Sequence, residues 1–192
     1  MGRRREFDEA EVVEKAMLAF WKDGWRDTSP QRLVEATGLS RSSLYATFGN
    51  KQGLFLAALD LYVAQQRSFL TQMLAEGTVQ EGLERMYTLM VDKMRPGGGG
   101  MTCLVASSLL EVPVEDDETL ARVVQGQAQM MEVFEARFQR AIDEGELDGT
   151  RTAAELAQFI AAVNNGIQLA ARAHASADHL RSVTQMALDT VC

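Results

Sequence analysis

The sequence is poor in the residues that mark several common protein classes. Only three prolines and 7% aromatic residues occur among its 192 residues, while Ala, Leu, Met, Glu and Gln are abundant, which favours helices over sheets. The two cysteines, Cys103 and Cys192, lie far apart and give no disulfide framework, so a reducing cytoplasm is the expected location. No apolar run approaches the ~18 residues that a membrane helix needs, and no apolar stretch follows the basic N-terminus as in a secretory signal.

Basic residues are scarce relative to acidic ones only in the part of the chain that follows residue 51. Hydrophobic residues make up 46% of the sequence, enough to bury a core, and the net charge is −8. Residues 1–51 hold nine Lys and Arg against eight Asp and Glu, a net of +1. Residues 52–192 hold ten against nineteen, a net of −9. An acidic body on a near-neutral head can still present positive charge where phosphates would lie.

Short helices with clear boundary signals are predicted near the N-terminus. Asp8 is a candidate N-cap for a first helix that ends at Gly24. Ser29 followed by Pro30 starts a second helix, with serine as the cap and proline in the first turn, where its missing N–H costs nothing. This second helix runs to about Thr37.

A tight corner then leads into a third short helix. Gly38 suits the left-handed residue that closes a helix, and Ser40 can cap the helix that follows over 41–48. In this third helix only Leu44 and Phe48 need be buried, so its remaining surface is polar and uncommitted. Two short helices joined by a glycine turn, the second with a free polar face, are typical of a helix-turn-helix.

The rest of the chain is predicted to be helical throughout. Helical periodicity and capping residues predict an all-α protein of about nine helices, the later ones over about 51–76, 78–94, 102–111, 117–144, 152–173 and 176–191. Arg95, Pro96 and the four glycines 97–100 predict a flexible break. No strand and no internal repeat is evident.

The first fifty or so residues resemble the tetracycline-repressor (TetR) family of bacterial one-component regulators. The motifs that carry the resemblance are REFD, AFWKDGW, TSPQRLVEATGLS and SLYATFGNKQGLF. The remaining two-thirds are similar only in helix count, helix length and the segment CLVASSLLE. The resemblance implies residues 1–51 as a helix-turn-helix DNA-binding head and 52–192 as an effector-binding and dimerisation domain. It also implies a homodimer on palindromic double-stranded DNA, acting as a repressor that a small apolar or amphipathic effector releases.

The third helix supplies most of the predicted DNA contacts. A helix that enters the major groove needs small side chains so that its backbone can approach the bases. Arg41 suits guanine or a phosphate, Tyr45 and Lys51 suit phosphates, and a solvated surface helix is the alternative reading. The predicted DNA-binding residues are Ser29, Gln31, Arg32, Arg41, Ser42, Ser43, Tyr45, Ala46, Thr47 and Lys51. Arg3, Arg4 and Arg5 form either an arm that reaches DNA or a solubilising tail.

The body carries candidates for effector binding. Ten methionines, most of them downstream of residue 70, suit either an adaptable apolar pocket or ordinary helical core. The candidate pocket residues are Met86, Met90, Met130, Phe134, Phe138 and Asn164. Cys103 is either a redox or electrophile sensor, with Arg95 near enough in sequence to lower its pKa, or an inert core thiol.

Small residues on a late helix favour a subunit contact, because they let helices approach closely. The predicted dimer interface is Ala157, Ala161, Gly166, Ala170 and Met186. His174 and His179 have no spacing diagnostic of a metal and are expected at the surface or in an interface.

Three function classes remain to be separated. The leading hypothesis is a dimeric DNA-binding transcriptional regulator. No nucleophile–base pair, carboxylate dyad, phosphate loop or metal cluster has meaningful spacing, so neither an enzyme nor a cofactor, metal or membrane partner is expected. The third class is a helical adaptor whose head has lost DNA binding.

Overall fold

Helices account for the whole regular structure of the part of the chain that can be described. The computed structural model describes residues 7–94 and 102–192, and within these residues it contains nine helices and no strand. They are α1 (Glu9–Asp23), α2 (Pro30–Thr37), α3 (Arg41–Phe48), α4 (Lys51–Ala75), α5 (Val79–Met94), α6 (Leu104–Glu111), α7 (Asp117–Asp143), α8 (Ala153–Arg172) and α9 (Ala177–Val191). The all-α prediction is confirmed.

Local capping explains why the helices begin where the sequence predicts. The side chains of Asp8, Ser29, Ser40 and Asn50 each accept a backbone N–H from the first turn of the helix that they precede. Thr152 and Glu155 form a complete capping box at the start of α8. These bonds satisfy N–H groups that have no partner within the helix, so each boundary is fixed by a few adjacent residues.

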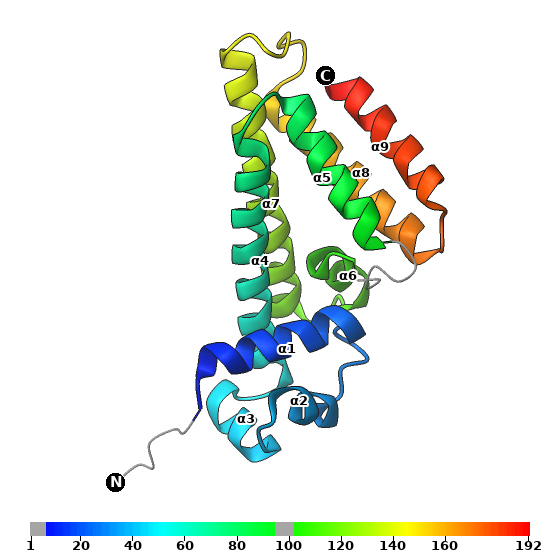
Figure 1. Cartoon of the computed structure of the whole chain (residues 1–192). Helices are drawn as coiled ribbons and strands as arrows, with labels where there is room; N and C mark the ends of the chain where they lie inside the picture. The colour runs from blue at the N-terminus through cyan, green and yellow to red at the C-terminus, as the bar shows by residue number, and fades with distance from the viewer. Residues whose placement is uncertain (1–6, 95–101) are drawn as a thin grey trace.

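The other seven helices are arranged around two long ones. Helices α4 and α7 pack against each other along their length, with α1–α3 at one end and α5, α8 and α9 around the other (Figure 1). The short helix α6 packs on both α4 and α7 between these two groups (Figure 1). The fold therefore places the three N-terminal helices at one end of the molecule and the C-terminal helices at the opposite end.

The buried apolar side chains form two separate clusters. The proximal cluster lies at the end that holds α1–α3 and comprises Val12, Ala16, Met17, Ala19, Phe20, Leu33, Leu44, Leu54, Phe55, Ala58, Leu59, Tyr62, Val63, Leu104, Val105, Val112 and Val123. It extends along α4 beyond residue 51 and takes in α6, so α1–α3 share their core with those helices. The predicted division at residue 51 stays a prediction.

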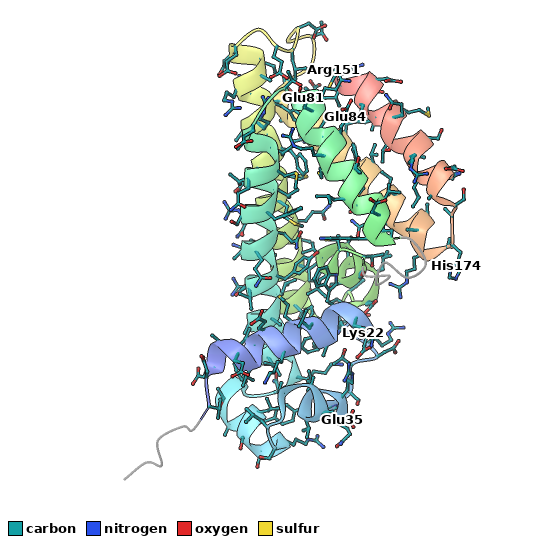
Figure 2. The ribbon with its side chains drawn as sticks, in the orientation of Figure 1. Lys22, Glu35, Glu81, Glu84, Arg151 and His174 are labelled. Carbon is teal, nitrogen blue, oxygen red and sulfur yellow. The ribbon has the colours of Figure 1, made fainter. Side chains whose placement is uncertain are left out.

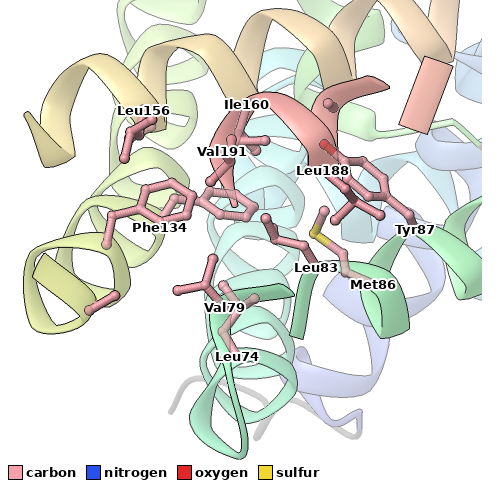
Figure 3. Close-up of a cluster of buried hydrophobic side chains, with 14 of the residues drawn as sticks. Leu74, Val79, Leu83, Met86, Tyr87, Phe134, Leu156, Ile160, Leu188 and Val191 are labelled. Atoms are coloured by element: carbon pink, nitrogen blue, oxygen red, sulfur yellow. The ribbon is translucent and has the colours of Figure 1, made fainter. Parts of the chain in front are cut away.

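The distal cluster joins α5, α7, α8 and α9, whose side chains converge on one another in Figure 3. It comprises Leu74, Val79, Leu83, Met86, Tyr87, Val91, Phe134, Phe138, Ala141, Ala153, Leu156, Ala157, Ile160, Ile167, Leu180, Ala187, Leu188 and Val191. Buried Arg137 ties this cluster to the turn between α4 and α5, because its guanidinium donates to the carbonyls of Leu74 (3.1 Å) and Gly77 (3.0 Å) and to Glu146 (2.9 Å). Among the described helices none is both long and apolar enough to cross a membrane.

Candidate nucleic-acid interface and internal cavity

The outer face of α3 is polar and open to solvent. Leu44 is 1% exposed and is the one fully buried residue that α3 contributes. Arg41, Ser42 and Ala46 are exposed. Ser43, Thr47 and Phe48 are half-buried. Leu44 thus anchors α3 in the proximal cluster. The opposite face of the helix carries small side chains and is open for an external contact.

Hydroxyl groups at the start of α3 are organised around the capping serine. The Ser40 hydroxyl accepts the Ser43 N–H at 3.2 Å and lies 2.9 Å from the hydroxyls of both Ser42 and Ser43. Thr47 donates its hydroxyl to the Ser43 carbonyl at 3.1 Å, which leaves its methyl group for apolar contact. These bonds fix the rotamers of the small side chains before any partner arrives.

Arg41 and Tyr45 form a pair along α3. The Arg41 guanidinium carbon lies 5.5 Å from the centre of the Tyr45 ring, a cation–π contact one helical turn apart. The Tyr45 ring itself packs against the proximal cluster and is half-buried. The pair presents a positively charged group on a ring that the core holds in place.

Lys51 has contacts that the sequence did not predict. Its ammonium lies 4.6 Å from the centre of the Trp25 ring and donates to the Arg26 carbonyl at 3.4 Å. Partial burial lowers the pKa of Lys51, while Asp27 and Glu111 act in the opposite direction. Lys51 therefore joins the start of α4 to the loop between α1 and α2, and its role as a phosphate contact stays a prediction.

The predicted contacts at the start of α2 are already engaged within the head. Ser29 caps the helix by accepting the Arg32 N–H at 3.1 Å. The Arg32 Nε donates to Asp23 at 2.6 Å, and Gln31 donates to Glu35 at 3.2 Å. Glu35 extends from α2 at the end of the molecule that α1–α3 form (Figure 2). Arg32 retains its terminal N–H groups for a further acceptor, whereas Asp23 offsets part of its charge.

Polar bonds between distant segments join the head to the rest of the chain. Gln52 donates to Asp116 and to the Thr119 hydroxyl, both at 3.0 Å, which links the start of α4 to the start of α7. Glu111 at the end of α6 accepts the Arg26 N–H at 3.4 Å and pairs with Arg172 of α8 at 3.5 Å. Sequence analysis missed these contacts, because no local signal relates residues 60 or more positions apart.

A cavity of about 160 Å³ lies where α4, α5, α7 and α8 meet. Five of the predicted pocket residues line it, namely Met86, Met90, Met130, Phe134 and Asn164. The assignment of Phe138 was wrong, because its side chain is 1% exposed and packs inside the distal cluster away from the cavity wall. Sequence analysis did not identify Tyr62, Phe69 or Gln168, which also line the cavity.

Cys103 is half-buried in the cavity wall. Its N–H donates to the side-chain oxygen of Gln168, and its thiol lies beside the buried Tyr62 hydroxyl. Burial, with the neighbouring Cys103 thiol, raises the pKa of Tyr62 well above its ordinary value. Arg95, the predicted partner of Cys103, lies outside the described residues, as do Arg3, Arg4, Arg5 and the glycine run.

Only two of the five predicted dimer residues are open to solvent. Gly166 is exposed and Met186 is 67% exposed, whereas Ala161 and Ala170 are half-buried against the chain's own helices. Ala157 was assigned wrongly, because it is 1% exposed inside the distal cluster and cannot contact a second copy. The open side of α8 is instead formed by residues such as Ala162, Gly166 and Leu169.

The two histidines lie at the surface. His174 occupies the turn between α8 and α9 with a positive φ of 62°, and Figure 2 shows it at that bend. His179 is exposed in the first turn of α9. Within the described ranges no group of three or more His, Cys, Asp and Glu side chains is arranged to hold a metal ion.

Two family models match the chain. Residues 12–58 match the model described as "Bacterial regulatory proteins, tetR family", and residues 81–187 match "Tetracyclin repressor-like, C-terminal domain". The matched regions include the head and most of the distal helices.

Two relatives match this chain over nearly its whole length. The regulator YezE of Bacillus subtilis is 31% identical over 100% of both chains, and the repressor ComR of Escherichia coli is 29% identical over 95% of this chain and 88% of its own. Among solved structures, a cysteine mutant of the regulator CifR in complex with 26-base-pair operator DNA is 28% identical, with a TM-score of 0.86 and full coverage of both chains. The reduced form of Escherichia coli NemR has a TM-score of 0.86 at 16% identity, with 95% and 96% coverage, and shows the likeness of fold alone.

Proposed function

Because the chain belongs to the TetR family and is a DNA-binding transcriptional regulator, we propose that it acts as a dimeric repressor released from a palindromic operator by a small effector. Repression is supported by the names of ComR and of AcnR from Corynebacterium glutamicum, both of which are repressors. The family is regulatory and not enzymatic. Residues 1–51 are assigned to DNA binding and residues 52–192 to effector binding and dimerisation.

The observation that supports this proposal most strongly is the open face of α3. Arg41, Ser42 and Ala46 are exposed and fill no core position of this chain, so this face is free to contact DNA. Small side chains let a helix backbone lie close to base edges, and a guanidinium fork matches guanine O6 and N7. The hydroxyl network around Ser40 holds this face in one conformation, which reduces the entropy lost on binding.

A two-fold dimer follows from the need to place two such helices on one duplex. Two copies of α3 in successive major grooves are about 34 Å apart, which predicts a palindromic site with half-sites about one helical turn apart. The exposed residues Ala162, Gly166 and Leu169 of α8, with Met186 of α9, are the proposed subunit contact. Leu169 is 59% exposed in the single chain, a large apolar side chain that a second copy would cover.

Arginine replacement tests the DNA-binding face. We expect Arg41→Ala to weaken binding to the DNA upstream of the protein's own gene by about tenfold to a hundredfold, because an arginine–guanine pair contributes about 1–3 kcal/mol. Arg67→Ala is the matched control, since Arg67 is also exposed but lies on α4 of the body and pairs only loosely with Glu132 at 3.9 Å. Fluorescence anisotropy of labelled DNA measures both affinities.

The same titration separates the regulator from an adaptor that binds protein instead of DNA. Replacing Tyr45 or Lys51 should lower DNA affinity while circular dichroism and sedimentation still report a folded dimer. If wild-type protein binds none of the upstream DNA at low salt, or if Arg41→Ala and Arg67→Ala bind equally well, the assignment of α3 as the recognition element is wrong.

A second candidate is a redox or electrophile sensor that acts through Cys103. It is favoured by the position of the Cys103 thiol in the cavity wall beside Tyr62. Treatment with N-ethylmaleimide should then abolish DNA binding by wild-type protein and by Cys192→Ser, but not by Cys103→Ser. An unchanged DNA affinity after mass spectrometry has verified modification of Cys103 would exclude this mode.

A further inference from the structure

The cavity contains a buried polar atom without a partner. The side-chain oxygen of Asn164, on α8, is screened from solvent and has no hydrogen-bond partner among the residues that the structure describes. Leaving such a group unpaired costs about 1–3 kcal/mol. The side-chain NH2 of Gln168, one helical turn further along α8, does not donate to this oxygen, and the oxygen of Gln168 accepts the Cys103 N–H. Asn164 therefore marks the place in the cavity where a ligand atom would be held.

The charges around the cavity restrict what can enter. None of the described residues that line it is Asp or Glu, so a cation would find no counter-charge. The single charged lining residue is Lys93, which is exposed at the rim and has its ammonium 5.3 Å from the centre of the Phe69 ring. Burying an unpaired charge is far more costly than burying a neutral polar group. The interior thus suits an uncharged ligand.

Size and wall chemistry favour an aromatic ring. The cavity volume of about 160 Å³ is close to the ~150 Å³ of an apolar cavity known to take up benzene. Thioether groups of Met86, Met90 and Met130 and the rings of Phe69 and Phe134 form its wall. Sulfur and ring edges interact favourably with an aromatic guest, and flexible methionines adapt to its outline.

The amide of Asn164 selects the polar group of the ligand. Rotation of the amide exchanges its oxygen and its NH2, so the same position can offer either an acceptor or a donor. A hydroxyl group both donates and accepts, and it therefore satisfies Asn164 in either orientation. A carbonyl only accepts and a protonated amine only donates, so each would match only one of them.

We propose that this cavity binds an uncharged aromatic compound of about one ring that carries a hydroxyl group, with the hydroxyl bonded to Asn164. The inference rests on the proposed function, because it names the class of effector that releases the repressor. The ring lies against the methionines of α5 and α7 and against Phe69 of α4 and Phe134 of α7, and Lys93 stays at the rim without contacting the polar group.

Four probes that share a methylphenyl ring and carry different polar groups, or none, test the ligand class. Isothermal titration calorimetry of DNA-free protein compares p-cresol with toluene, 4-methylbenzoate and 4-methylbenzylamine. We expect p-cresol to bind about tenfold more tightly than the other three, the value of one buried hydrogen bond. If toluene binds as tightly as p-cresol, or if either charged probe binds more tightly, the proposed class is wrong.

Replacement of Asn164 tests the position of the hydroxyl. Asn164→Leu keeps the branching and the number of heavy atoms but removes the polar group, so p-cresol should bind about tenfold more weakly while the affinity for toluene is kept. Asn164→Ser, which retains a hydrogen-bonding group, should keep part of the preference for p-cresol and remains informative if the leucine variant does not fold. Gln72→Leu, at an exposed amide on α4, is the matched control and should change neither affinity.

The failure of this inference and the failure of the proposed function give different results. DNA affinity of the wild-type protein is measured without any probe, and its absence would contradict the repressor while leaving the probe series interpretable. Normal DNA affinity together with equal binding of all four probes, or with unchanged p-cresol affinity in Asn164→Leu, would overturn the ligand assignment alone.

Discussion

The proximal and distal clusters are packed in different ways. Four of the five aromatic ring pairs in the described structure lie in or beside the proximal cluster, among them Phe20 with Phe55 at 5.1 Å and Trp21 with Tyr62 at 5.1 Å. Five methionines of α5 and α7 line the cavity, and the one ring pair of the distal half is Phe134 with Phe138 at 6.3 Å. Rigid rings hold the head in one geometry, whereas methionines leave the distal half adaptable.

The two regions also differ in whether their polar side chains have hydrogen-bond partners. All three buried side-chain atoms without a partner in the described residues, on Tyr87, Arg137 and Asn164, belong to the distal half. In the proximal region Gln52, Trp21 and Lys51 each donate to an acceptor on another segment. Of the three, only the Asn164 oxygen lies in the wall of the cavity, where a ligand could complete its hydrogen bonding, which fits a body that responds to an effector.

The largest expected loss of stability comes from a mutation that removes aromatic packing from the proximal cluster. Phe55 is fully buried, and its ring centre lies 4.6 Å from that of Trp25. Phe55→Ala should lower the free energy of unfolding by about 3–5 kcal/mol, the cost of a lost ring and the cavity that it leaves. Met90→Ala, at the half-buried cavity wall, should cost about 1–2 kcal/mol, because part of that side chain already faces empty space. Urea denaturation followed by circular dichroism compares them, and equal losses would contradict the difference between the two regions.

A smaller loss should follow when a paired polar group of the proximal region is removed. Gln52→Ala deprives Asp116 and the buried Thr119 of their shared donor and should cost about 2 kcal/mol. Gln80→Ala is the matched control, since Gln80 bonds only the exposed Glu84 of its own helix at 2.8 Å, and it should change stability by less than about 0.5 kcal/mol. Thermal and urea unfolding give both values. A loss from Gln52→Ala no larger than that from Gln80→Ala would show that the junction between α4 and α7 contributes little.

The smallest effects are expected at the two buried tyrosines, where the two Phe variants should differ in sign. Burial alone raises the pKa of Tyr87, whose hydroxyl has no partner in the described structure (Figure 3). Tyr87→Phe should therefore be neutral or stabilising by up to about 1 kcal/mol, whereas Tyr62→Phe loses the bonds to Cys103 and Leu104 and should cost about 1 kcal/mol. Because burial raises the pKa of both tyrosines in the folded state, their ionisation leaves the free energy of unfolding unchanged below pH ~10. Above that pH the unfolded chain loses its tyrosine protons first, so the free energy of unfolding falls as the pH rises. Unfolding at pH 7 measures the two variants, and a destabilising Tyr87→Phe would mean that its hydroxyl is paired.

Sequence analysis predicted the features that short segments determine. Helix boundaries agreed with the structure within one or two residues because caps such as Ser40 and Thr152 act on adjacent N–H groups. The polar face of α3 could be predicted because few of its residues are apolar: Leu44 is fully buried, while Phe48, also expected in the core, is half-buried against the proximal cluster. Periodicity identified residues on one side of α8 but not what that side contacts, so Ala157 was assigned to a partner although the chain's own α-helices cover it. The same limit explains Phe138, and the link from Glu111 to Arg26 has no local signal at all.

Hydroxyl-radical footprinting on the upstream DNA tests the central claim most directly, because it reports where the exposed face of α3 meets the duplex. Two protected segments related by a two-fold axis and centred about 10 base pairs apart are predicted. Both should disappear with Ser42→Glu, which adds a carboxylate to this face without touching the core. A single protected segment, or protection that persists unchanged in Ser42→Glu, would contradict the account.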